Sequence, residues 1–164
     1  MLIGILADTH DNLPMIERAL TELKARKVEV LLHAGDYVAP FALKRILASE
    51  LPLVGVFGNN DGERRGLGKL SEDIHPGPYR FELEGRTIVM AHEPDMLKDA
   101  LGDGDDLGVC GHTHEPQMSI GPPLVVNPGE VGGWLTGRST CAVVDLKTMC
   151  AELLEFAGHE RAKR

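Results

Sequence analysis

The sequence predicts an α/β fold whose first half is a parallel sheet with crossover helices. Three short apolar runs, at residues 2–7, 28–32 and 53–57, have the length of buried strands, and helical patterns separate them. Strand, helix, strand, helix, strand is the order that parallel pairing requires. In sheets of this kind the ligand site lies beyond the carboxyl ends of the strands, and polar residues follow each of the three runs.

Two helices are expected between these strands. The first follows Asn12, a suitable N-cap, has Pro14 in its first turn, and repeats apolar residues on one face as far as Leu23. The second covers about 41–49 and again places its apolar residues on one side. Each helix can therefore cover one face of the sheet.

The second half of the chain is expected to form hairpins, with one short helix. Glycine-containing turns between apolar runs are the signal for paired strands. The expected elements are strands at 79–83 and 87–91 around Glu84-Gly85-Arg86, a helix at 94–101, a strand at 107–110, strands at 118–120 and 124–126 around Gly121-Pro122-Pro123, a glycine-rich loop at 127–137, and strands at 140–146 and 150–156.

Length and composition indicate one domain over residues 1–157 and a polar C-terminal tail over 158–164. A chain of 164 residues with 43% hydrophobic residues is long enough for one core. The apolar run at 2–7 is too short for a signal peptide or a membrane span. The three cysteines form no C-x-x-C pair, which argues against a disulfide framework or a thiolate zinc site. We therefore expect a cytoplasmic protein that does not bind membranes.

The net charge of the chain limits the classes of partner that it is expected to bind. A net charge of −8 and a pI near 5.3 argue against nonspecific binding to nucleic acid or to an anionic membrane, because no basic field attracts polyanions. Bound divalent cations would reverse that sign locally.

Side chains of the kinds that bind metals follow five of the expected strands. They are Asp8, His10, Asp36, Asn59, His92, His112 and His114. On an extended backbone His112 and His114 point the same way, so both imidazoles can face one ion. Seven N and O donors are too many for one tetrahedral ion, but they suit two ions that share a bridging carboxylate. Since no thiolate is present, we expect Mn above all, or Ni, Fe, Co or Zn.

Each of these residues also has a simpler interpretation. His10 can cap a turn, and His92 can be a half-buried polar residue at a strand end. His33 lies on an apolar strand and is interpreted as a core histidine or as one that supports a ligand. His75 and His159 are expected at the surface. The number of motifs at strand ends favours the metal site for His10 and His92.

The motifs D-x-H, G-D, G-N-x-[DE], H and G-H-x-H, in this order over residues 8–114, resemble the calcineurin-like metallophosphoesterase superfamily. Gly58-Asn59-Asn60-Asp61-Gly62 and Asn127-Pro128-Gly129-Glu130 are similar to its small single-domain microbial phosphodiesterases. The resemblance implies a four-layer α-β-β-α sandwich in which two facing mixed β-sheets are flanked by helices.

The resemblance also implies the roles of the residues. Two divalent transition-metal ions per chain would hold a bridging hydroxide that attacks phosphorus in line. The catalytic candidates are Asp36, Asn60 and Asp61. If the roles of the matching motif positions in the superfamily apply here, the first ion is bound by Asp8, His10 and His114, the second by Asn59, His92 and His112, and Asp36 bridges them.

Two positions depart from the pattern of the superfamily. Many members have histidine where Asn60 stands, and an amide cannot protonate a leaving group, which favours diesters over unactivated monoesters. Glu93 follows His92 where glycine is common, which affects the backbone at the second metal. Arg64 and Arg65 lie close enough to the third motif to bind a substrate phosphate together with Asn60, although a solvated arginine pair is the preferred interpretation of the two arginines.

We therefore expect a metal-dependent phosphodiesterase that acts on a small-molecule phosphoester. The first alternative is a phosphomonoesterase acting on a phosphorylated metabolite or a phosphoprotein. The second is a non-catalytic scaffold similar to the retromer subunit of the same fold, and the third is a site whose ions only hold loops together. Trp134 in the glycine-rich loop is expected to line the cleft or to form a contact in a homo-oligomer.

Overall fold

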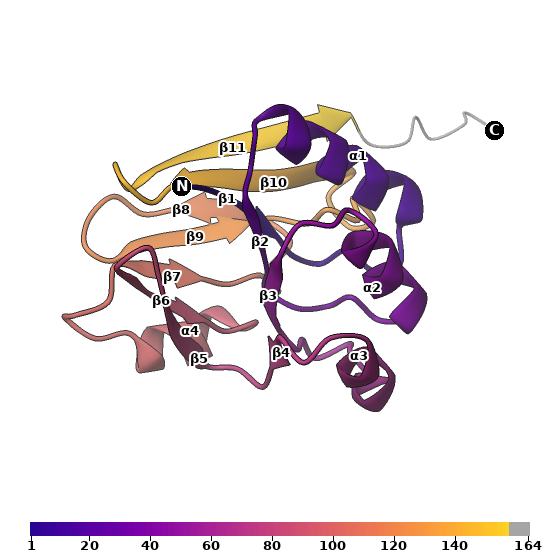
Figure 1. Ribbon diagram of the computed structural model, residues 1–164, viewed down its shortest axis with the longest axis horizontal. Helices are drawn as coiled ribbons and strands as arrows, with labels where there is room; N and C mark the ends of the chain where they lie inside the picture. The colour runs from indigo at the N-terminus through magenta and orange to yellow at the C-terminus, as the bar shows by residue number, and fades with distance from the viewer. Residues whose placement is uncertain (158–164) are drawn as a thin grey trace.

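The computed structural model describes residues 1–157, and the expected tail at 158–164, with His159, lies outside the described residues. Its helices are α1 (Leu13–Ala25), α2 (Pro40–Leu47), α3 (Arg64–Leu70) and α4 (Pro94–Ala100). Its strands are β1 (Leu2–Leu6), β2 (Val30–His33), β3 (Leu53–Val56), β4 (Ile74–His75), β5 (Tyr79–Leu83), β6 (Arg86–Met90), β7 (Leu107–Val109), β8 (Pro116–Met118), β9 (Leu124–Pro128), β10 (Arg138–Asp145) and β11 (Cys150–Ala157). Figure 1 shows their arrangement.

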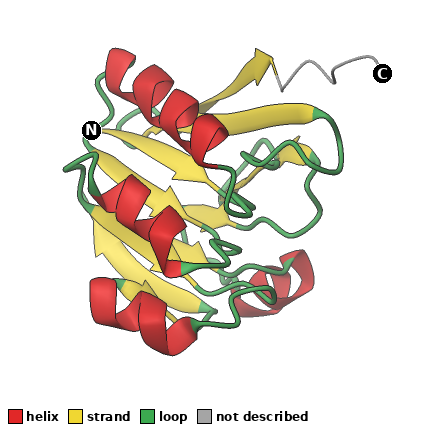
Figure 2. Cartoon of the chain, turned by 90° about the vertical axis from the view of Figure 1, so that its right-hand side faces the viewer, coloured by secondary structure: helices red, strands yellow, loops and turns green. Residues whose placement is uncertain are grey.

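The first sheet has the strand order β11-β10-β1-β2-β3-β4. β1 to β4 pair in parallel, while β10 pairs antiparallel with β1 and with β11. Helices α1 and α2 connect the parallel strands and lie with α3 along one side of this sheet (Figures 1 and 2). The predicted parallel sheet with crossover helices is confirmed.

The second sheet has the strand order β5-β6-β7-β9-β8. β6, β7 and β9 are parallel, and the edge strands β5 and β8 are antiparallel to their neighbours. Helix α4 covers part of its outer face, where Leu97 packs in a cluster with Val89, Ala91 and Cys110. Both sheets are therefore mixed, as the resemblance implies.

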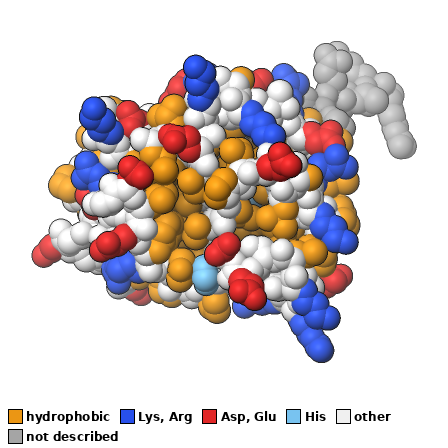
Figure 3. Space-filling model, in the orientation of Figure 1, with side chains coloured by type: hydrophobic (Ala, Val, Ile, Leu, Met, Phe, Trp, Pro, Cys, Tyr) orange, Lys and Arg blue, Asp and Glu red, His pale blue; other side chains and the backbone are white. Residues whose placement is uncertain are grey.

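The surface carries charges of both signs. Figure 3 shows Lys, Arg, Asp and Glu side chains around the margin of one face, with hydrophobic side chains gathered in its middle. None of the helices within residues 1–157 is both long and apolar enough to cross a membrane. On the face shown, the net negative charge of the chain is not gathered into one patch.

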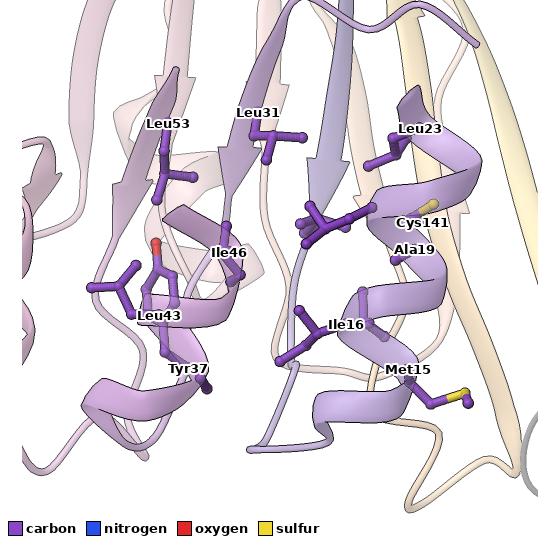
Figure 4. Packing of buried hydrophobic residues seen from close by; sticks show 14 of the residues in the cluster. Met15, Ile16, Ala19, Leu23, Leu31, Tyr37, Leu43, Ile46, Leu53 and Cys141 are labelled. Atoms are coloured by element: carbon purple, nitrogen blue, oxygen red, sulfur yellow. The ribbon is translucent and has the colours of Figure 1, made fainter. Parts of the chain in front are cut away.

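Between the helices and the first sheet lies one layer of the core. Figure 4 shows Ile16 and Leu23 of α1 and Leu43 and Ile46 of α2 between the helices and the sheet, in one buried cluster with Leu31 of β2. The helical residues are those that the apolar spacing assigns to the buried face.

A second layer of the core lies between the two sheets. Ile3 and Ile5 of β1 are fully buried in a cluster that also contains Ile88, Met90 and Val109 of the second sheet. Successive strand side chains point to opposite faces, so β1 is apolar on both faces and its sequence reads as a continuous apolar run. Helices, sheet, sheet and helix form the four-layer sandwich.

The carboxyl ends of parallel strands from both sheets meet at one end of the molecule. Figure 2 shows the loops gathered where the strand arrows point. The backbone N–H of Asp8, after β1, donates to the carbonyl of Gly35, after β2. The imidazole Nδ1 of His92, after β6, lies 2.8 Å from the carbonyl oxygen of Ala34. These contacts join loops from both sheets.

Several elements differ from the predictions. Helix α3 was not expected, because glycines at 66 and 68 interrupt the apolar pattern and Leu67 is the buried residue of the helix. Strand β4 was not expected either, because its two residues are too few to show a strand pattern. The expectation of a strand at 118–120 was wrong by two residues. β8 begins at Pro116, which is tolerated because an edge strand does not need the missing N–H. His75, expected at the surface, is half-buried and stacks on Tyr79 with ring centroids 3.7 Å apart.

The close contact between Gly55 of β3 and Tyr37 allows a test of the fold. Gly55 of β3 lies against the ring of Tyr37, and a Cβ at this position would overlap the Tyr37 hydroxyl. We expect Gly55→Ala to lower the free energy of unfolding by about 1–3 kcal/mol because it overpacks the core. Urea unfolding measures this change.

The matched control removes the obstacle. Tyr37→Phe deletes the hydroxyl, whose hydrogen bond to the His33 carbonyl is long at 3.5 Å, so the double variant should recover more than half of the lost stability. A double variant as unstable as the sum of the single variants would contradict this packing.

Candidate metal centre

The structure places every predicted ligand residue at the carboxyl end of a strand. Asp8 and His10 follow β1, Asp36 follows β2, Asn59 follows β3, His92 follows β6, and His112 and His114 follow β7. The first three strands belong to one sheet and the last two to the other. The side chains therefore approach one another from two facing layers.

One group of donors consists of Asp8, His10 and His114. One donor atom of each lies within 4.8 Å of the others. The Oδ1 atom of Asp8 is 3.7 Å from His10 Nε2 and 3.5 Å from His114 Nε2. Within residues 1–157, the buried atoms Asp8 Oδ1 and His10 Nε2 have no hydrogen-bond partner. Unpaired buried polar atoms are costly, and a cation bound to both would remove that cost.

A second group converges on Asn59. Its Oδ1 atom lies 2.9 Å from His92 Nε2 and 2.9 Å from His112 Nδ1. Asp36 lies between the two groups, because its Oδ2 atom is 3.4 Å from both His10 Nε2 and His92 Nε2. This is the position that a bridging carboxylate requires.

The expectation that His112 and His114 face one ion was wrong. Both residues have left-handed backbones, with φ of 70° and 62°, so the loop is not extended and the i, i+2 rule does not apply. His112 joins the group around Asn59, and His114 joins the group around Asp8. The resemblance to the superfamily implies the same division, with His114 at the first ion and His112 at the second.

The far nitrogens of two histidines are held by protein acceptors. His92 Nδ1 faces the Ala34 carbonyl at 2.8 Å, and His114 Nδ1 faces Glu130 Oε2 at 2.9 Å. An N–H at Nδ1 leaves the lone pair of the neutral imidazole on Nε2, the nitrogen that faces the carboxylates of the site. Both rings are therefore fixed in the tautomer that a metal ion binds.

Two further residues that the sequence analysis did not assign hold the loop of His112 and His114. The Asn127 amide donates to the Gly111 carbonyl at 2.8 Å and to Thr113 Oγ1 at 3.0 Å. Glu130, which is fully buried, accepts from the N–H of residues 134–136 and contacts His114. Asn127 and Glu130 belong to the motif Asn127-Pro128-Gly129-Glu130, so the motif was the available signal.

The glycines before three of the ligands are required by close packing. A Cβ at Gly35 would lie 2.7 Å from His92 Nδ1, and one at Gly111 would lie 2.7 Å from Asp8 Oδ2. A Cβ at Gly58 would overlap the Asp36 carboxylate. In each case a ligand from one motif packs over the glycine of another, which explains why the motifs read G-D, G-N and G-H.

The backbone of the site is strained. Asp8, His10 and Asp36 have φ of 51°, 39° and 62°, in the left-handed region that side chains disfavour. Val38, a β-branched residue, has φ of 77°. Such conformations cost of order 1–3 kcal/mol each and persist where the surrounding structure imposes them. The strain here is concentrated in the loops that carry the ligands.

The electrostatics of the site favour cations. Burial raises the pKa of Asp36, but contact with His92 and hydrogen bonds from Asn60 outweigh it and hold the pKa well below its usual range. Burial lowers the pKa of His92, but contact with the Asp36 carboxylate and the charges of Asp36 and Asp8 outweigh it and raise the pKa. The same negative field attracts a divalent ion.

Asn60 and Asp61 contact the site differently. The backbone N–H of Asn60 donates to Asp36 Oδ1 at 2.8 Å, and its side-chain amide donates to Oδ2 at 2.7 Å. The buried carboxylate of Asp61 accepts backbone N–H groups of Asp36, Val38 and Gly58 at 2.7–3.0 Å. Asn60 therefore orients Asp36 directly, while Asp61 holds the loops around it.

Arg64 and Arg65 are both exposed on α3. The Arg64 guanidinium donates to the carbonyls of Asp61 and Gly58 at 3.2 and 2.9 Å and lies over the Phe57 ring. It therefore secures the Gly58–Asp61 loop from outside.

His33 and Trp134 lie next to the ligands. His33 is fully buried, accepts the Gly35 N–H at Nδ1, and contacts Thr9 Oγ1 through Nε2. Burial lowers its pKa to about 3, so it is neutral and supports the ligand loops. Trp134 Nε1 donates to the His10 carbonyl at 3.1 Å, which places the exposed indole beside the site.

The donor set fits divalent metal ions. Asp8, Asp36 and Asn59 offer oxygen and the four histidines offer nitrogen, the combination that suits borderline ions such as Mn, Fe, Co, Ni and Zn. The structural sign of this fit is that no described residue forms a hydrogen bond with Asp8 Oδ1 or His10 Nε2.

Several known proteins are similar to this chain in sequence or in fold. A phosphodiesterase of Methanocaldococcus jannaschii is 35% identical over 154 residues, covering 88% of this chain and 93% of the relative. The solved structure of an archaeal phosphodiesterase has a TM-score of 0.84 at 30% identity, covering 95% of this chain and 100% of that chain. Vacuolar protein sorting 29 from Cryptosporidium parvum has a TM-score of 0.64 at 16% identity, covering 95% and 97%, which shows the fold alone.

A family model agrees with these relatives. The model of the calcineurin-like phosphoesterase superfamily domain matches residues 1–149, from β1 to the turn before β11. Its span includes every predicted ligand and the loop that contains Asn127 and Glu130. The chain therefore belongs to the calcineurin-like phosphoesterase superfamily.

Proposed function

We propose that this protein is a phosphodiesterase that depends on two divalent metal ions. The observation that carries the proposal is the pair of donor groups on either side of Asp36, in which Asp8 Oδ1 and His10 Nε2 have no hydrogen-bond partner among residues 1–157. The similarity to a relative named a phosphodiesterase supports it.

In this proposal each donor group holds one ion. Asp8, His10 and His114 hold the first, Asn59, His92 and His112 hold the second, and Asp36 is shared. When bound, two such ions supply Lewis acidity to the phosphoryl oxygens and lower the pKa of water. Manganese is the favoured metal, since a mixture of carboxylate, amide and imidazole donors without thiolate suits it.

The remaining residues have roles in positioning. Asn60 keeps the Asp36 carboxylate oriented through two hydrogen bonds. The Asn60 amide does not release a proton, so it cannot act as the general acid that protonates the leaving alcohol. Asp61 holds three backbone amides rather than facing the ligand cluster, and we assign it to positioning rather than to chemistry. Binding of a substrate phosphate by Arg64 or Arg65 stays a prediction.

The substrate class follows from Asn60. Without a general acid at this position, cleavage depends on the quality of the leaving group. A small-molecule diester with an acidic leaving alcohol is favoured over an alkyl monoester, which is the order expected for a phosphodiesterase. A phosphomonoesterase is the second candidate, and the exposed Asn60 beside Asp36 is the observation that disfavours it.

The surroundings of the chain are also part of the proposal. Cys110, Cys141 and Cys150 are free thiols in the structure, which suits the reducing cytoplasm. The scattered charges of Figure 3 offer no uniform basic surface for nucleic acid on that face. Trp134 contacts its own chain at the site, which supports a place at the cleft rather than in an oligomer contact.

Hydrolysis of a chromogenic phosphodiester and of the matching monoester tests the proposal. Metal-stripped protein is titrated with Mn, Ni or Zn, and Asp36→Asn is compared with Asp103→Asn, an exposed control with the same loss of charge. We expect turnover that requires metal and favours the diester. Asp36→Asn should bind fewer than about two ions and lose turnover by at least roughly 100-fold, while its unfolding temperature stays close to that of the control.

Two results would contradict the proposal. Full activity of Asp36→Asn would exclude the shared carboxylate. Metal binding without turnover of either ester would move the assignment to the scaffold, or to a site whose ions only stabilise the fold, which then appears as metal-dependent melting alone.

Asn60→His tests the role of the amide. An imidazole can donate a proton to the leaving oxygen, and general acids contribute about 10²–10⁴-fold. We expect the ratio of monoester to diester turnover to rise by about 10-fold or more. Asn60→Gln is the control, because it exchanges one amide for another and should leave the ratio low. An unchanged ratio in Asn60→His refutes the role.

A further inference from the structure

A small pocket opens directly beside the candidate metal ligands. Asn59 and His92 form part of its wall, and its volume is about 160 Å³. The remainder comes from Phe57 and Gly58 after β3, from Arg64 at the start of α3, from Glu93 and Met96 at the start of α4, and from the turn that joins β4 to β5. A group seated in this pocket would contact the same residues as the second metal ion.

The pocket is too small for a whole substrate. Pockets that enclose drug-sized ligands have volumes of about 300–1,000 Å³. A volume of about 160 Å³ accommodates a single ring or a group of similar size. Because the pocket shares Asn59 and His92 with the metal centre, it suits one substituent of a molecule whose phosphate lies on the metals.

The chemistry of the pocket walls is mixed. Phe57 and Met96 offer apolar surface, and Met96 is 40% exposed. Arg64 is fixed over the Phe57 ring by its bonds to backbone carbonyls. Glu93 is exposed, and within residues 1–157 its carboxylate forms no hydrogen bond or ion pair. A ligand ring would meet an apolar side and a free carboxylate that accepts hydrogen bonds.

Asn60 lies outside the wall of this pocket. In the proposed function the leaving oxygen departs on the side of Asn60, the position where a histidine would protonate it. Asn60 is not part of the pocket wall; its amide points to Asp36. The pocket is therefore suited to the substituent that stays on phosphorus.

We propose that the pocket binds the retained substituent of a phosphodiester, and that this substituent is a ring with N–H or O–H donors, of the kind that a nucleoside carries. Glu93 accepts from the donors of the ring, while Phe57 and Met96 contact its apolar face. The inference rests on the proposed function. It names Glu93 and Met96 as specificity-determining residues, neither of which is a candidate ligand.

Two diesters with the same leaving group test the inference. Both release p-nitrophenolate, and the retained substituent is thymidine in one and methyl in the other. Wild-type protein with Mn should have a lower KM for the thymidine ester. In Glu93→Gln and in Met96→Ala, the KM for that ester should rise roughly 2- to 10-fold, the value of one hydrogen bond or a modest contact. The kcat values and the KM for the methyl ester should not change.

Asp95→Asn is the matched control, because Asp95 is an exposed acid in the same first turn of α4 but not in the pocket wall. Equal changes for both esters in Glu93→Gln and Met96→Ala, or no preference of the wild type for the thymidine ester, overturn the inference and leave the proposed function standing. Absence of turnover of both esters with every metal contradicts the proposed function, and the inference with it.

Discussion

Burial of two carboxylates at the junction of the two sheets is the constraint on which the structure of this site depends. Asp8 and Asp36 are almost completely shielded from water, and an ionised carboxylate in such a place is costly unless it is paired. The protein meets part of the requirement with N–H donors, from His112 to Asp8 and from Asn60 to Asp36. In the described part of the chain Asp8 Oδ1 has no hydrogen-bond partner, which leaves the rest to a cation.

The loops around these carboxylates follow from that constraint. Bringing ligands from five strands within a few ångströms of one another requires left-handed turns, and it leaves no room for a Cβ at Gly35, Gly58 or Gly111. The strain persists because Asp61 and Glu130 each collect several backbone N–H groups and hold their loops in place. Acidic residues thus act at two levels, as ligands and as anchors for the loops.

Local sequence signals predicted the parts of the fold that depend on local burial. The runs that became β1, β2 and β3 are apolar on both faces, so a short continuous run identified each one. Helix α3 gave no such signal, because its glycines interrupt the pattern. The strand at Pro116 was displaced in the prediction because the tolerance of proline depends on an edge position that only the sheet order reveals.

The candidate site, too, was only partly predictable from the sequence. The identities of the candidate ligands could be read from their positions at strand ends, but the division of His112 and His114 between two donor groups depends on positive φ values that the i, i+2 rule does not contain. The motif Asn127-Pro128-Gly129-Glu130 was a signal for Asn127 and Glu130, but their contacts join residues 14 to 16 positions apart, so the motif did not identify what they hold. Glu93 was noted in the sequence only as a departure from the superfamily, and its place in a pocket wall depends on how the residues after β6 approach those after β3.

The most direct test of the account is anomalous diffraction from crystals soaked in Mn²⁺. We predict two peaks about 3.5–4 Å apart, one beside His10 and His114 and the other beside Asn59 and His92, with Asp36 contacting both. A single peak, or two peaks that do not share Asp36, would contradict the claim that this carboxylate joins two metal sites.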